Sequence, residues 1–124
     1  MGKFVIRRVN TGYKFTLRAS NGQGIAASEV YNTRAACLRG IESVRKNAPI
    51  AGCEDHTAGE FSKAANPKFE LYQDRGGAYR FRLKARNGSI IAVSDSYVTR
   101  AACENGIDSV RKNAKAGEIT EETE

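Results

Sequence analysis

The chain contains the same sequence unit twice. Residues 13–48 align with residues 79–114 at a constant shift of 66 positions without a gap, and 23 of the 36 aligned pairs are identical. Two unbroken runs of each copy, at 33–37 and 43–48 in the first and at 99–103 and 109–114 in the second, account for 11 of these identities. In a chain of 124 residues, one copy alone is too small to bury an adequate core. The repeat therefore predicts a monomer that is an internal pseudo-dimer, with both copies folded around a common interior.

Each copy predicts three strands. Apolar residues alternate with polar ones at Phe4 and Ile6, and again from Tyr13 to Ala19. In the second of these stretches the apolar positions are identical in both copies and the polar ones differ, as expected if only the apolar set faces the core. Asn-Gly pairs follow at 21–22 and 87–88 and predict two-residue hairpin turns. We expect the third strands at 25–30 and 90–96.

A helix follows in each copy, with Thr33 and Thr99 as N-caps. In the first copy its apolar face consists of Cys37, Ile41, Val44 and Ala48. Gly40 and Gly106 lie in mid-helix, where glycine costs about 1 kcal/mol relative to alanine. This pattern indicates a close approach of the sheet or of the other helix, although a recent duplication also accounts for it.

The combination of an Asn-Gly turn, Tyr31, the run 33–37 and the run 40–48, present in both copies, resembles the YegP-like family of small bacterial tandem-repeat proteins. The resemblance implies an α+β fold of two tandem β3-α-β repeats that form a single antiparallel sheet, with two helices on one face and exchanged C-terminal strands. Residues 53–57 would then pair within the second copy's part of the sheet, and residues 118–123 within the first copy's part. It implies no activity, because members of the family have no assigned function.

We place the first repeat at residues 1–58, a linker at 59–66 and the second repeat at 67–124. The linker is polar and rich in small residues, which is typical of a surface connection. The tail after Gly117 carries four glutamates, and we expect its last residues to fray.

The chemistry-bearing residues do not predict an enzyme. The one histidine, His56, forms with Cys53 a Cys-x-x-His pair, which offers only two of the three or four ligands that a zinc site needs. Cys37 and Cys103 lie on the expected buried helix face, where a thiol acts as a small apolar group. We therefore expect no catalytic residues, no metal and no cofactor.

The cysteines also bear on location. Three cysteines without a C-x-x-C spacing favour reduced thiols in the cytoplasm, and no apolar run is long enough to span a membrane.

Charge is the positive functional signal. The chain has a net charge of +6, and without the residues after Gly117 the balance is 20 basic against 10 acidic groups. Helices on one face of a sheet leave the other face open to solvent. The hypothesis is a basic sheet face that binds nucleic acid or another polyanion, formed by Lys14, Arg18, Arg80, Arg82, Lys84 and Arg86. The alternatives are a solvated face with no ligand, and a protein-interaction or stress-associated structural module.

Arg34 and Arg100 form the last candidate site. Each lies in the first turn of a helix, where a cation opposes the helix dipole. Structural ion pairs with Glu29 and Asp95 are one interpretation, and a small anion site at the helix start is the other. Tyr31 is expected to pack on the helix entry.

Overall fold

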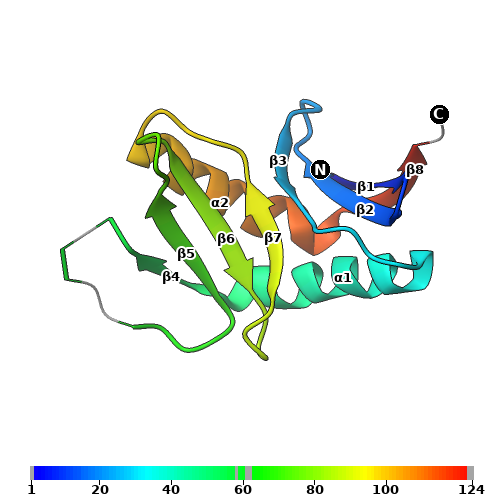
Figure 1. Cartoon of the computed structure of the whole chain (residues 1–124), viewed down its shortest axis with the longest axis horizontal. Coiled ribbons are helices and arrows are strands. Elements are labelled where there is room, and N and C mark those ends of the chain that lie inside the picture. Colours follow the sequence, from blue (N-terminus) through cyan, green and yellow to red (C-terminus); the bar gives the residue numbers. More distant parts are fainter. Residues whose placement is uncertain (1, 58, 61–62, 123–124) are drawn as a thin grey trace.

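The computed structural model describes residues 2–57, 59–60 and 63–122. They form one eight-stranded sheet, in the order β4-β5-β6-β7-β3-β2-β1-β8, and two helices that cover one of its faces (Figure 1). The first repeat contains β1 (Lys3–Val9), β2 (Gly12–Arg18), β3 (Gly24–Ala27), α1 (Arg34–Asn47), the short 3-10 helix η1 (Ala48–Ile50) and β4 (Gly52–Asp55). The second contains β5 (Lys68–Gln73), β6 (Tyr79–Lys84), β7 (Ile90–Ser94), α2 (Arg100–Ala116) and β8 (Glu118–Glu122). The predicted α+β fold of two β3-α-β repeats is confirmed.

The final strand of each repeat pairs with the other repeat's first strand. β4 pairs with β5 and β8 pairs with β1, so the exchange predicted for the two C-terminal segments is confirmed. Both of these pairs are parallel, whereas the six central strands are antiparallel. The expectation of a purely antiparallel sheet is therefore corrected to a mixed sheet. A parallel partner requires the chain to cross back to the same end of the sheet, and residues 56–67 supply that long connection between β4 and β5.

Arginines on each helix hold the strand that follows the other helix. Arg111 on α2 donates a hydrogen bond to the carbonyl of Ala51 at 2.9 Å, just before β4, and its guanidinium lies 5.1 Å from the centre of the Phe69 ring. Arg45 on α1 makes the equivalent contacts with the carbonyl of Gly117 and with the ring of Phe4. The exchange is thus stabilised by the same contacts on both sides.

Both repeats contribute to one hydrophobic core between the sheet and the helices. Phe4 and Phe15 meet edge to face with ring centres 5.8 Å apart, and Phe69 and Phe81 repeat the arrangement at 5.9 Å. Helix α2 contacts strands of both repeats, and α1 contacts both β2 and β7. Among the described residues, no helix is long and apolar enough to cross a membrane. The shared interior that the duplication predicts is present.

The helix starts agree with the sequence and the strand ends differ. Thr33 and Thr99 accept hydrogen bonds from the backbone N–H groups of Ala36 and Ala102. The third strands, expected to continue to residues 30 and 96, end earlier, at Ala27 and Ser94. There the hydroxyls of Ser28 and Ser94 accept hydrogen bonds from the backbone N–H groups of Phe15 and Phe81. These bonds replace backbone hydrogen bonds between the strands. β8 is a strand through Glu122, and the fraying expected for the last residues of the tail falls on residues 123–124, which lie outside the described part of the chain.

The mid-helix glycines are explained by a tyrosine. A Cβ atom on Gly40 would lie 2.4 Å from the hydroxyl oxygen of Tyr31, and one on Gly106 would lie equally close to that of Tyr97. Tyr31 therefore packs on the middle of α1 and not on its entry, and its ring stacks on Phe15 at 6.4 Å. The close approach expected at these glycines comes mainly from this side chain, with Phe15 of the sheet beside it.

This packing gives the first testable prediction. Gly40→Ala should lower the free energy of unfolding by about 1 kcal/mol, because an overpacking cost of about 1–3 kcal/mol exceeds the gain in helix propensity of about 1 kcal/mol. Urea unfolding followed by circular dichroism measures the change. Tyr31→Phe should recover part of the loss in the double variant, and Arg39→Ala on the exposed side of α1 should cost almost nothing. A Gly40→Ala protein as stable as the parent would show that Tyr31 does not restrict this position.

Candidate functional site

The face of the sheet opposite the helices carries five of the six basic residues predicted for it. In the two hairpins, the residues that alternate with the core phenylalanines and leucines point to this open face. In the second repeat they include Arg80, Arg82 and Lys84 on β6, and in the first repeat they include Lys14 and Arg18 on β2 and their neighbours Lys3 and Arg7 on β1. The two repeats differ sharply in how these charges are paired.

In the second repeat the cations are paired with acidic side chains. Arg80 Nε lies 3.0 Å from an oxygen of Asp74, and Arg82 Nε lies 2.5 Å from Oε1 of Glu70. Lys84 Nζ lies 3.3 Å from the same Glu70 oxygen. The guanidinium of Arg82 also lies 4.9 Å from the centre of the Tyr72 ring. This half of the basic face is therefore largely neutralised within the protein.

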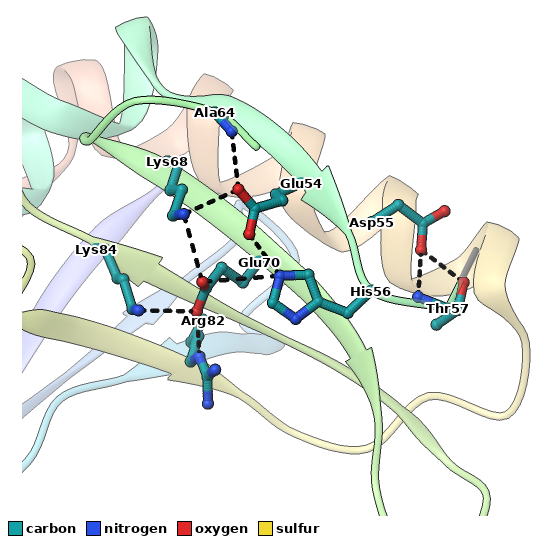
Figure 2. Close-up of polar contacts among 9 residues, drawn as sticks. All are labelled: Glu54, Asp55, His56, Thr57, Ala64, Lys68, Glu70, Arg82 and Lys84. Carbon is teal, nitrogen blue, oxygen red and sulfur yellow. Dashed lines mark hydrogen bonds and ion pairs between the residues drawn. The ribbon is translucent and has the colours of Figure 1, made fainter. Parts of the chain in front are cut away.

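A buried carboxylate pair lies on the two outer strands of this half, β4 and β5 (Figure 2). Glu54 on β4 and Glu70 on β5 are register partners on adjacent strands, and each residue is only 3% exposed. Lys68 Nζ lies between them, 2.9 Å from Glu54 and 3.6 Å from Glu70, and His56 Nε2 lies 2.6 Å from Glu54. The backbone N–H of Ala64 donates to Glu54 at 2.8 Å, so the connection after β4 covers the pair. We call Glu54, His56, Lys68, Glu70, Arg82 and Lys84 the charged network.

The charged network keeps both carboxylates ionised. Hydrogen bonds from Lys68, from the Ala64 backbone and from His56 lower the pKa of Glu54 from 4.5 to about 2. Burial acts to raise the pKa of Glu70, but ion pairs with Arg82 and Lys84 outweigh it and lower that pKa. The same contacts with Glu54 raise the pKa of Lys68. The network is a set of fixed charges at neutral pH, with three permanent cations against two carboxylates.

Three of these side chains have the chemistry of metal ligands. Oxygen or nitrogen atoms of Glu54, His56 and Glu70 lie within 4.8 Å of one another. Lys68, however, already bridges the two carboxylates and would oppose a second cation at this place. The donor set is therefore better explained as an internal ion-pair network than as a metal centre.

In the first repeat the open-face cations are not neutralised. Lys3 lies directly opposite Arg18 in the register of β1 and β2, and Arg7 lies directly opposite Lys14. Within the described part of the chain, none of the four forms an ion pair, although Arg18 donates to the carbonyl of Gly22 at 3.2 Å. We call these four residues the cation quartet.

An open hollow lies over part of the cation quartet. It has a volume of about 360 Å³ and is lined by residues that include Lys3, Val5, Arg18, Thr120 and Glu122. Val5 lies on this open face and not in the shared core, yet it is only 7% exposed because β2 and β8 flank it. Space for a ligand thus exists between the long cationic side chains.

The remaining predicted positions lie elsewhere. Arg34 pairs with Glu121 on β8, and Arg100 pairs with Asp55 on β4 with Nε and Oδ2 2.7 Å apart. The expected partners, Glu29 and Asp95, are therefore wrong, because strand exchange brings acids of the other repeat to each helix start. Arg86 lies in the β6–β7 turn and lines a separate hollow with Lys46 and not the open face.

The thiols behave as expected at two of the three cysteines. Cys37 and Cys103 are fully buried, and burial raises the pKa of Cys103 to about 11. Cys53 is exposed on β4, and it does not join the charged network with His56, which contacts Glu54 instead.

Sequence reasoning missed Glu54, Lys68 and Glu70 as members of one cluster. A signal was present in the comparison of the two copies. By the registers of the parallel pairs, Glu70 corresponds to Val5 and Glu54 corresponds to Thr120, and by the repeat Arg82 corresponds to Thr16. Three neighbouring positions that are uncharged in one half of the sheet are thus all charged in the other half.

The charged network gives the second prediction. Glu54→Gln should lower the melting temperature at pH 7, because it leaves Lys68 without its main carboxylate partner in a mostly buried position. Since the folded pKa of Glu54 lies below its ordinary value, its contribution is complete above pH 4.5 and is lost as the pH falls towards 2. The difference from the parent protein should therefore shrink over that interval.

Thermal unfolding at several pH values tests this prediction. Glu29→Gln is the control, because Glu29 is exposed and forms no ion pair with a described residue. Equal melting temperatures for Glu54→Gln and the parent protein at neutral pH would contradict a structural role for the network.

Comparisons with known proteins give the family. The sequence model of a family described as "Domain of unknown function (DUF1508)" matches residues 9–55 and 74–121. A "UPF0339 protein in ptx operon 5'region" from Stutzerimonas stutzeri is 34% identical over 121 residues, which cover 97% of this chain and 96% of that protein. A UPF0339 protein from Methanosarcina acetivorans is 58% identical over 52 residues, which cover 42% of this chain and 90% of that protein.

The fold has a counterpart among solved structures. The solution NMR structure of a protein of unknown function, YegP from E. coli, superposes with a TM-score of 0.80 at 30% sequence identity, covering 98% of this chain and 93% of that one. Two matched repeats, relatives over nearly the full length and the same fold agree with the resemblance found in the sequence. The chain belongs to the YegP-like DUF1508 (UPF0339) family, whose domain has no known function.

Proposed function

We propose that this protein is a non-catalytic binding module of the cytoplasm, and that the open face of its first repeat binds the phosphate backbone of nucleic acid. The observation that carries the proposal is the cation quartet: two directly opposed pairs of like charges that no described acidic side chain neutralises. Arg80, Arg82 and Lys84 are removed from the set of candidate phosphate-binding residues, because they already form ion pairs with Asp74 and Glu70.

Opposed like charges cost stability in a sheet. Cross-strand pairs contribute roughly 0.2–1 kcal/mol each, and like charges directly opposite act against the fold. A bound phosphate between Lys3 and Arg18, or between Arg7 and Lys14, would convert each repulsion into attraction. Each pair of like charges is therefore unfavourable in itself, and the glutamate beside it on β8 forms no ion pair with a described residue that would remove the repulsion, whereas a bound anion would.

The chemistry of the face favours the backbone over the bases. The open-face positions of the two strands are Lys3, Val5, Arg7 and Val9 on β1 and Gly12, Lys14, Thr16 and Arg18 on β2, and none of these is aromatic. Proteins that read single-stranded bases use aromatic stacking platforms. Binding through Lys and Arg alone is electrostatic, depends little on base sequence and weakens with salt.

The third prediction tests this interface. A variant with all four members of the cation quartet changed to Gln should lose most of the affinity of the parent for a fluorescently labelled single-stranded DNA, measured by anisotropy. Four neutralised phosphates predict a slope of log affinity against log salt of about −3 for the parent, or about a 50-fold loss from about 50 to 200 mM salt. The variant's slope should approach zero.

A charge-matched control separates the site from the net charge. Arg39, Lys46, Lys112 and Lys115 are exposed on the helices and form no ion pair with a described residue. Changing these four to Gln removes the same charge from the opposite side and should leave the slope unchanged. Equal losses in both variants, or no binding by the parent at low salt, would overturn the proposal. In the latter case the alternative, a protein-interaction or stress-associated structural module without a nucleic-acid role, takes its place.

A further inference from the structure

We propose that the acidic strand β8 makes the site selective for single strands over duplexes, through Glu118 and Glu122. This inference rests on the proposed function and names the class of nucleic acid that the site accepts. It follows from the position of these two glutamates beside the cation quartet.

The three strands β8, β1 and β2 place their open-face charges in two rows. Glu118 is the register partner of Lys3, which is the partner of Arg18. Four residues along, Glu122 is the partner of Arg7, which is the partner of Lys14. Each row therefore has one acidic residue on β8 and one basic residue on each of β1 and β2. The two rows are about 13 Å apart, because four residues separate them along a β-strand.

The row between them is uncharged. It consists of Thr120, Val5 and Thr16, and the open hollow lies over Thr120 and Val5. Phosphates bound at the two rows would therefore belong to one chain that follows the direction of β1 and β2. That path is about two strands wide, or about 10 Å, and β8 limits it on one side.

A duplex is too wide for this path. Its major groove alone is about 12 Å across, and phosphates lie on both sides of that groove. A duplex with one backbone on the cation quartet would bring further phosphates over its flank, where Glu118 and Glu122 repel them. A single strand can keep all its contacting phosphates on β1 and β2.

Within the described part of the chain, the two glutamates form no ion pair that fixes β8 in place. Both side chains are exposed, and neither forms an ion pair with a described residue. Glu121, on the other face of the same strand, pairs with Arg34 and holds β8 to α1. The acids that fix the strand are thus different from the acids that border the cation quartet, so the latter can be changed without loss of the fold.

The fourth prediction compares single and double strands. The probe is a labelled mixed-sequence DNA of about 16 nucleotides, free or annealed to its complement. At low salt the parent should bind the single strand about tenfold more tightly. In the Glu118→Gln/Glu122→Gln variant, duplex affinity should rise about tenfold relative to single-strand affinity, because each glutamate about 6 Å from a phosphate that only the duplex carries costs about a factor of three in water. Single-strand affinity should also rise, but by less than duplex affinity, because the phosphates held on the cation quartet lie about 7 Å from the glutamates in both complexes.

The control is Glu29→Gln/Asp95→Asn, which removes the same charge from exposed positions after β3 and β7 and should leave the preference for single strands intact. Thermal unfolding verifies that each variant is folded. Equal gains for both probes in the β8 variant, or a parent without preference, would overturn this inference and leave the proposed function standing. Loss of binding to both probes by the parent would instead overturn the proposed function.

Discussion

Each repeat of this protein depends on a strand supplied by the other. β4 leaves α1 and joins β5, and β8 leaves α2 and joins β1, so the outer side of each three-stranded unit is completed by the opposite half. Arg45 and Arg111 fix the exchanged segments by hydrogen bonds to backbone carbonyls, and their guanidinium groups lie over the rings of Phe4 and Phe69. Burial of these rings is what makes the shared core large enough for a chain of this length.

The exchange preserves the scaffold while the open face has diverged. Behind the sheet, the phenylalanine pairs, the N-caps and the arginine contacts are repeated almost position for position. In front of it, one half carries Glu54, Glu70 and Arg82 where the other carries Thr120, Val5 and Thr16. One half thus satisfies its charges internally, and the other leaves its cations for solvent or a ligand. Such a division is available to a fused pair of copies because the two faces can change independently.

The sequence predicted those features that depend on local periodicity. The alternation of apolar and polar residues predicted the hairpins. Thr33 and Thr99 predicted where the helices begin, because an N-cap hydrogen bond joins residues only three positions apart. The family resemblance gave the exchanged strands. The sequence did not predict whether those strands pair in parallel or antiparallel. Their direction depends on the path of the connection between β4 and β5.

The candidate site was predicted in part. The basic character of the open face follows from residue alternation alone. The pairing of those charges could not be predicted, because Glu54 and Glu70 become neighbours only through the register of a parallel pair. Arg34 likewise meets Glu121, 87 residues away, only after the exchange. The contact of Tyr31 with Gly40 depends on side-chain packing. The mid-helix glycine indicated that some group approaches the helix closely, but not that this group is Tyr31.

The exchange of edge strands between the two repeats also affects how the protein unfolds. If the first repeat melts, it withdraws β4 from the second, and if the second melts, it withdraws β8 from the first. Neither half can then persist as a partly folded intermediate with its hydrophobic side exposed. We expect denaturation to be a single cooperative transition of the whole chain, even though its sequence consists of two copies of one unit.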